Sequence, residues 1–183
     1  FGKFKLDHSF PAVGEADKIY DLIDHQRASQ LYLWGIPLVG MTRWHEGYEK
    51  TYKEYDYNTL LYVDTFNERR GVLTANETTD YYWGFGNTRD GAVLVDIPEG
   101  VTVGFFADMW QQGFTDIGIF GPNAGRGGSH AIVGPNTPAD KIPGPADDLL
   151  VHHSSTEQFI YVMRMIGTPE EVKELSGQIK IYN

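Results

Sequence analysis

The chain has 183 residues, of which 41% are hydrophobic and 22% are charged, and its formal net charge is -10. This length and composition fit one ordinary globular domain or two very small ones, and they exclude a disordered chain. The lack of cysteine excludes disulfides, thiolate catalysis and thiolate-ligated metal centres, and the acidic charge argues against nucleic acid and anionic membranes as partners.

No apolar run approaches the roughly 20 residues that a membrane-spanning helix needs. The chain begins at Phe1 with no signal peptide, so we expect a mature or trimmed product. Acidic, cysteine-free chains are common among exported bacterial proteins. We therefore expect a periplasmic or extracellular location and no membrane partner.

Two amphipathic helices are predicted in the first third of the chain. The first runs from Glu15 to Trp34, where apolar residues recur every three or four positions, and Gly35-Ile36-Pro37 is expected to end it because proline disfavours the helix interior. The second carries the ring stripe Trp44, Tyr48 and Tyr52. This stripe indicates core packing more strongly than a ligand shelf.

The hydrophobic period changes after Leu60, where short β-branched or aromatic runs alternate with turn residues such as Pro98-Glu99-Gly100. The predicted strands are Leu60–Phe66, Tyr81–Phe85, Ala92–Ile97, Val101–Trp110, Phe114–Phe120, His130–Val133 and Gln158–Ile166. A surface loop is expected over Pro138–Asp148.

A short third helix is predicted after Thr168, because a capping hydroxyl is followed by Pro169 and, three positions after the cap, by Glu171. It is expected to run to about Ser176, with Gly177 in the left-handed conformation behind it. Ile179 to Tyr182 then alternate like a strand. A chain that ends in this way suggests a sheet that other polypeptide completes.

These patterns predict a mainly β (α+β) fold. The expected body is an antiparallel β-sandwich or jelly-roll-like arrangement, with a barrel as the alternative, carrying two N-terminal helices and one short C-terminal helix. The helical segment 1–57 is expected to pack on the β-rich body 58–183 within a single domain.

Several sequence blocks resemble one known family, the uncharacterised proteins with a "domain of unknown function 1254". The blocks are Leu22–Ala28, Tyr32–Pro37, Thr74–Thr79, Asp108–Gln111, Asp116–Gly118, Gly121–Pro122, Gly125–Gly128 and Ile132–Pro135. The resemblance implies a mostly β fold, a bacterial and often exported setting, no assured activity, and a following β-rich domain catalogued as 1214. That domain, or a cleaved partner chain carrying it, is an expected partner. The chain departs from the family pattern at Gln112-Gly113 and at His153-Ser154-Ser155.

Candidate ligand-binding residues are Asn76, Thr78, Trp110 and Gln111, which place uncharged hydrogen-bonding groups and a large ring near strand ends. Such groups suit a polar, uncharged ligand, and carbohydrate is the first candidate. The alternative is structural: the amide and hydroxyl satisfy neighbouring backbone, and the ring covers the core.

Whether the protein is an enzyme stays open. A glycosidase needs two facing carboxylates, and Asp108 and Glu157 are the candidate pair for a hydrolase or lyase, with Asp116 considered beside them. Acidic residues at strand ends more often cap turns.

No metal site and no cofactor are expected, because the six histidines lack a recognised metal-binding spacing. If a site existed, its ligands would be His130 or one of His152 and His153, with Asp108 or Glu157. Adjacent histidines in a strand point to opposite faces.

The leading hypothesis is therefore an exported bacterial protein that binds a polar uncharged molecule, with processing of that molecule left open. A structural subunit of a homo-oligomer is the rival, in which rings such as Trp44, Tyr48 and Tyr52 hold identical chains together.

Overall fold

The computed structural model describes residues 3–63 and 78–183. Contacts within the chain divide it into two compact units, Phe1–Val39 and Gly40–Asn183, which we call unit 1 and unit 2. The division falls inside the long helix α1 (Glu15–Thr51). No helix among the described residues is both long and apolar enough to cross a membrane.

Unit 1 begins with a small hairpin. Strand β1 (Leu6–Asp7) pairs antiparallel with β2 (Phe10–Pro11), and the two residues between them, His8 and Ser9, have positive φ angles of 48° and 71°. Two consecutive positive φ angles are typical of the tight turns whose twist matches that of a hairpin. The first part of α1 begins at Glu15, and three residues separate it from the end of β2.

The prediction of two helices separated at Pro37 is wrong, because α1 continues through this proline to Thr51. A proline inside a helix costs about 3 kcal/mol, since it cannot donate to the carbonyl four residues earlier and its ring crowds that turn. Here the turn before Pro37 is largely exposed, so water can reach the backbone that the proline leaves without its donor. The helix-forming sequence on both sides of Pro37 therefore stabilises α1 by more than the proline destabilises it.

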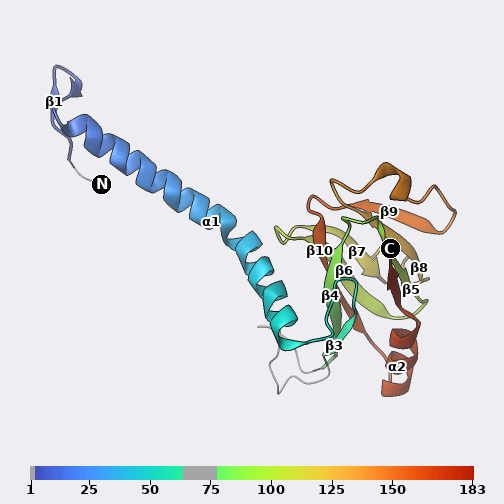
Figure 1. Ribbon diagram of the computed structural model, residues 1–183. Coiled ribbons are helices and arrows are strands. Elements are labelled where there is room, and N and C mark those ends of the chain that lie inside the picture. Colours follow the sequence, from blue (N-terminus) through green and yellow to red (C-terminus); the bar gives the residue numbers. More distant parts are fainter. Residues whose placement is uncertain (1–2, 64–77) are drawn as a thin grey trace. The chain divides into compact units, whose positions relative to one another are not determined.

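Unit 2 contains two sheets (Figure 1). The larger sheet has the strand order β3-β4-β10-β6-β7 and is antiparallel throughout. Its strands are β3 (Leu61–Val63), β4 (Tyr81–Asn87), β10 (Gln158–Met165), β6 (Thr102–Asp108) and β7 (Gly113–Gly118). The sequence predicted all five. The end of the first predicted strand, beyond Val63, lies outside the described residues.

The smaller sheet has the strand order β11-β5-β8-β9. Its strands are β11 (Lys180–Tyr182), β5 (Val93–Ile97), β8 (Gly128–Val133) and β9 (Leu149–His153). Strand β9 was not among the predicted strands, and it pairs parallel with β8, an exception to the expected antiparallel order. Parallel neighbours need a long crossover. The predicted loop Pro138–Asp148, which includes the short 3₁₀ helix η1 (Ala139–Lys141), lies in this crossover.

One hydrophobic core joins strands of both sheets. Its members are Tyr82, Val93, Val95, Ile97, Phe106, Ile117, Ile132, Phe159, Tyr161, Met163 and Met165. The described strands form open sheets, so the barrel alternative is wrong. The fold is an antiparallel, sheet-rich α+β fold.

The last turns of α1 pack on β4 through aromatic rings. The ring of Trp44 lies edge-on to Trp83 with centroids 4.4 Å apart, and Tyr48 lies perpendicular to the same ring at 5.3 Å. Tyr52 follows the end of the helix and stacks on Tyr48 at 5.4 Å. These rings therefore make contacts within unit 2, as the core interpretation of the stripe predicted.

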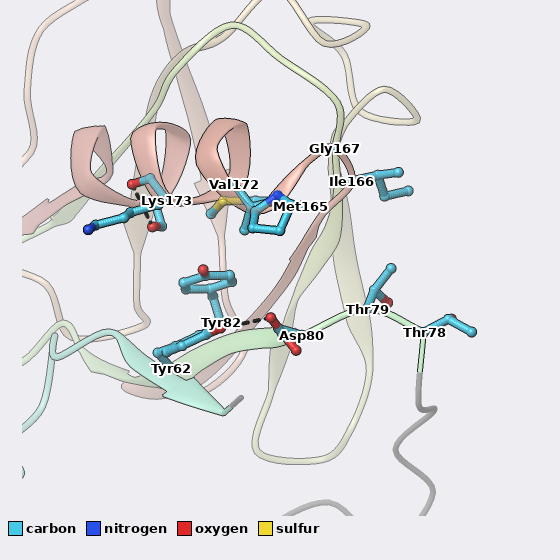
Figure 2. Close-up of a pocket in the computed structure, with 12 residues that line it drawn as sticks. Tyr62, Thr78, Thr79, Asp80, Tyr82, Met165, Ile166, Gly167, Val172 and Lys173 are labelled. Carbon is cyan, nitrogen blue, oxygen red and sulfur yellow. Dashed lines mark hydrogen bonds between the residues drawn. The ribbon is translucent and has the colours of Figure 1, made fainter. Parts of the chain in front are cut away.

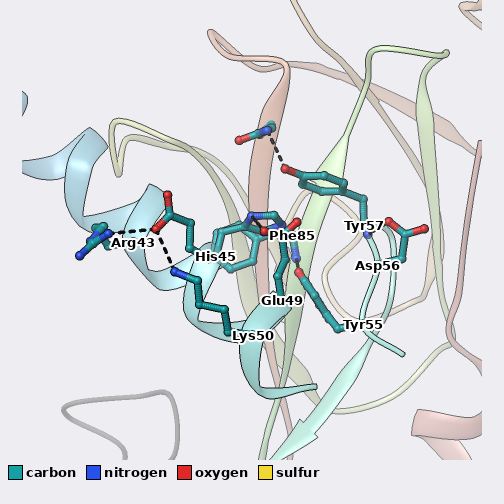
Figure 3. Close-up of polar contacts among 10 residues, drawn as sticks. Arg43, His45, Glu49, Lys50, Tyr55, Asp56, Tyr57 and Phe85 are labelled. Carbon is teal, nitrogen blue, oxygen red and sulfur yellow. Dashed lines mark hydrogen bonds and ion pairs between the residues drawn. The ribbon is translucent and has the colours of Figure 1, made fainter. Parts of the chain in front are cut away.

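A second set of contacts secures the same helix end (Figure 3). The buried ring of His45 stacks on Tyr57 with centroids 4.5 Å apart. The Tyr57 hydroxyl accepts a hydrogen bond of 2.6 Å from the Gln158 side chain, and the Tyr55 hydroxyl accepts one of 3.2 Å from the Phe85 amide. The link between α1 and the larger sheet thus combines ring packing with directed hydrogen bonds.

Helix α2 (Pro169–Gln178) has the predicted capping box. The Thr168 hydroxyl accepts from the Glu171 amide at 3.3 Å, and the Glu171 carboxylate accepts from the Thr168 amide at 2.7 Å. The expectation for Gly177 is wrong: this glycine lies inside the helix, and the chain leaves through Ile179 in an extended conformation. That exit leads straight into β11, which pairs with β5, so tertiary pairing decides the end of the helix.

Candidate functional site

A cavity of about 670 Å³ lies where β3, the start of β4, the end of β10 and helix α2 meet (Figure 2). We call it the tyrosine pocket. Its lining residues are Tyr62, Thr78, Thr79, Asp80, Tyr82, Met165, Ile166, Gly167, Pro169, Val172, Lys173 and Ser176. All of them belong to unit 2.

Two tyrosines from neighbouring strands give the pocket an aromatic side. Tyr62 and Tyr82 are register partners in β3 and β4, so their side chains lie on the same face of the sheet. Their rings stack with centroids 4.8 Å apart and planes 24° from parallel. Tyr62 is 53% exposed, whereas Tyr82 is buried beneath it. The Tyr62 ring is therefore accessible to a ligand, and the buried Tyr82 ring holds it in place from below.

A carboxylate lies beside this ring. The Tyr62 hydroxyl donates a hydrogen bond of 2.7 Å to Asp80, which immediately precedes β4. This contact fixes the carboxylate at the pocket while leaving its remaining lone pairs able to accept other donors.

The two threonines enter the pocket on the segment that leads into β4. Thr79 accepts a hydrogen bond of 2.6 Å from the Arg164 side chain, whose guanidinium also lies over the Tyr81 ring, 5.3 Å from its centroid. Arg164 belongs to β10, the neighbour of β4, so a cross-strand contact fixes this segment. Thr78 also lines the pocket and is exposed, whereas Thr79 is half-buried.

Helix α2 forms the opposite side. It contributes Pro169, the apolar side chain of Val172 and the ammonium group of Lys173. The capping box at Thr168 fixes where this helix begins and hence which of its residues meet the pocket. Of the described residues, apolar side chains, hydroxyls, one carboxylate and one ammonium group thus converge on a single open cavity.

The structure separates the predicted ligand-binding residues. Thr78 lines the tyrosine pocket, whereas Asn76 lies outside the described residues. Trp110 and Gln111 lie in the β6–β7 turn, which follows Asp108. Met165, at the pocket, pairs with Thr102 at the other end of β6. Six residues of strand correspond to about 20 Å, so the turn lies at the opposite end of the sheet from the pocket.

The oxygens of Asp108 are engaged in holding the β6–β7 turn. One accepts from the amides of Trp110 and Gln112, each at 2.9 Å, and the other accepts from the Ser155 hydroxyl. The Asp108 side chain is buried. These contacts match the turn-capping interpretation that the sequence left open.

Glu157 lies in the turn between β9 and β10 and binds two other loops. Its carboxylate accepts from the Asn136 amide group at 2.9 Å and from Arg89 at 3.4 Å. Asp116 is an exposed residue of β7. None of these three carboxylates lines the tyrosine pocket.

The structure brings together two of the histidines. His130 on β8 and His152 on β9 face each other with a ring-nitrogen distance of 2.9 Å, while His153 points to the exposed side of β9. Burial, followed by the neighbouring His152, lowers the pKa of His130 to about 4. Within the described ranges, no group of three or more histidine, aspartate or glutamate side chains could hold a metal ion.

Sequence reasoning missed four residues that shape the pocket: Tyr62, Asp80, Tyr82 and Lys173. Asp80 and Tyr82 belong to the polar and aromatic run that also contains Thr78, so that run carried a signal for them. Tyr62 and Lys173 come from elements far apart in the chain. Only the pairing of β3 with β4 and the position of α2 bring them to the same cavity.

The comparisons with known proteins concern family and fold. No curated protein sequence matches the chain. A crystal structure of the VPA0106 protein from Vibrio parahaemolyticus is similar in fold, with a TM-score of 0.61 and 14% identity. The similarity covers 83% of this chain and 36% of that one, so this chain spans about a third of its neighbour's length. The model of the family described as "Protein of unknown function (DUF1254)" matches residues 57–183, which is most of the chain. This chain therefore belongs to the DUF1254 family.

Proposed function

We propose that this domain binds a polar, uncharged ligand, with carbohydrate as the leading candidate, in the tyrosine pocket. The observation that carries the proposal is the exposed Tyr62 ring. This ring stacks on Tyr82, and its hydroxyl donates a hydrogen bond to Asp80. Sugars present an apolar C–H face and a rim of hydroxyls. The face of the Tyr62 ring can pack against the C–H face, and the Asp80 carboxylate can accept hydrogen bonds from the hydroxyls.

The size and the charge of the pocket support this ligand class. Its volume of about 670 Å³ falls within the range typical of small-ligand sites. Among the described residues that line it, only Asp80 and Lys173 are charged, and they carry opposite charges. The net charge of -10 disfavours polyanions over the molecule as a whole.

The wider setting is part of the same proposal. We propose an exported bacterial protein, periplasmic or extracellular, whose two sheets lie face to face as a sandwich. The core cluster shared by both sheets supports the layered arrangement. A β-rich domain or a cleaved partner chain is the proposed companion.

The proposal is tested by a glycan array followed by isothermal titration calorimetry of the saccharides that bind. Tyr62→Ala and Asp80→Asn are expected to weaken binding at least about tenfold, the effect of losing roughly 1.4 kcal/mol. Trp110→Ala is the matched control, because it removes a large ring at the opposite end of the sheet and should leave the affinity unchanged.

Two results would count against the pocket. If no saccharide binds, carbohydrate is excluded as the ligand. Binding that depends on Trp110 and ignores Tyr62 and Asp80 would move the site to the β6–β7 turn.

A further inference from the structure

The middle of α1 carries an apolar surface around the whole helix. Four successive residues, Leu31, Tyr32, Leu33 and Trp34, together with Ile36 and Val39, have exposed fractions between 48% and 73%. We call these six residues the α1 apolar stretch. Successive helical positions differ by about 100°, so four in a row present apolar side chains in every direction. A helix that is hydrophobic all round is normally buried.

The charges of this region do not oppose the approach of a second copy. From Ala28 to Thr42 no residue is charged, which corresponds to about 20 Å of helix. On either side the charges are paired within the helix, Arg27 with Asp24 at 3.8 Å and Arg43 with Glu46 at 3.1 Å. Two copies of a chain with a net charge of -10 repel each other in general, but they meet no unpaired charge of their own along this segment.

The exposed apolar area is similar in size to one side of a contact between copies. A large aromatic side chain buries about 150–250 Å², so six large side chains with these exposed fractions leave on the order of 700 Å² of surface open to solvent. A standard protein interface buries about 800 Å² on each partner. Apolar patches of this size are uncommon on proteins that stay monomeric.

We propose that the α1 apolar stretch is the contact surface for a second copy of this chain. The rings that the sequence suggested for such a contact, Trp44 and Tyr48, pack instead on β4. The proposal is independent of the ligand assigned to the tyrosine pocket.

Sedimentation equilibrium of the 183-residue chain at about 1–100 µM tests the proposal, with a pair of matched variants. Tyr32 is 73% exposed and lies within the stretch, whereas Tyr20 is 67% exposed on the same helix outside it. We expect the wild-type chain to self-associate. Tyr32→Glu should weaken the association by at least about tenfold and Tyr20→Glu by less than about twofold, because a charge is costly only where the surface becomes buried.

Disulfide trapping gives a second readout, because the chain has no cysteine. Gln30→Cys, at the edge of the stretch, should give a covalent dimer under mild oxidation, and Asp90→Cys, an exposed position of unit 2, should not. A wild-type chain that stays monomeric over the whole concentration range would overturn the proposal. Equal effects of Tyr32→Glu and Tyr20→Glu on the association would also overturn it. A third contrary result would be a monomeric chain that binds phospholipid vesicles and loses this binding in Tyr32→Glu.

Discussion

Acidification is expected to destabilise unit 2 through its buried histidine pair. Burial, and then the neighbouring His152, lowers the pKa of His130 to about 4, and burial is also the main cause that lowers the pKa of His152. In the unfolded chain both imidazoles return to an ordinary pKa near 6.5. Between these values the unfolded chain binds protons that the folded chain does not, so the free energy of unfolding decreases as the pH falls.

The geometry of the pair explains the direction. The two ring nitrogens are 2.9 Å apart, so one ring must donate the hydrogen bond and the other must accept it. The ring of Phe106 lies edge-on to His130 with centroids 5.7 Å apart, and His130 is only 2% exposed. A proton added to the pair places a positive charge in an apolar environment. If both rings are protonated, an N–H group of each ring faces the other and the hydrogen bond between them is lost. The Asp96 carboxylate acts in the opposite direction by raising the pKa of His130, but it is the smallest of the three causes.

The expected magnitude follows from the pKa of His130. One pKa unit corresponds to about 1.4 kcal/mol, so His130 alone reduces the free energy of unfolding by about 2 kcal/mol between pH 7 and pH 5. This contribution is fully present above a pH of about 6.5 and is lost as the pH falls through about 4. His152 adds to the loss with the same sign.

Urea denaturation at several values from pH 7 to pH 5, for the wild-type chain and for His130→Gln, measures this contribution. The decrease in unfolding free energy should be smaller by about 2 kcal/mol in the variant, because glutamine does not titrate. His25→Gln, at an exposed position of α1, serves as the control and should keep the wild-type dependence. The reasoning is refuted if His130→Gln has the same pH dependence as the wild-type chain, or if NMR shows His130 titrating near pH 6.5 in the folded protein.

Predictions at three further positions concern the stability of unit 2. An added Cβ at Gly86 would lie 2.2 Å from the Phe159 ring, so Gly86→Ala should destabilise the fold by about 1–3 kcal/mol. Gly177→Ala meets nothing within 4 Å inside α2 and should be neutral or stabilising by up to about 1 kcal/mol; thermal denaturation that ranks the two in the reverse order would contradict the packing. Asp108→Ala should cost about 3 kcal/mol, because it removes the acceptor of two turn amides and of Ser155. Asp108→Asn should retain most of this stability in the same assay, and an alanine variant as stable as the wild-type chain would show that the turn does not depend on this carboxylate.

The local features of this protein could be read from its sequence. The capping box at Thr168 depends on residues within four positions of each other, so its hydrogen bonds could be predicted before any tertiary contact was known. The strands of the larger sheet carry β-branched and aromatic runs between turn residues, which is sufficient to predict all five of them. The packing role of the ring stripe at Trp44 also followed from its helical spacing.

Other features were decided by contacts between distant segments. The local signal at Pro37 indicated a helix end, yet α1 continues, and Gly177 remains helical because the chain leads directly into β11. Strand β9 acquires its partner only through a crossover after β8. The candidate site has the same origin, because Tyr62, Asp80 and Lys173 belong to elements that strand pairing and helix docking bring to one cavity. Short-range hydrogen bonding and periodicity are encoded locally, whereas the meeting of remote side chains depends on the global packing of the chain.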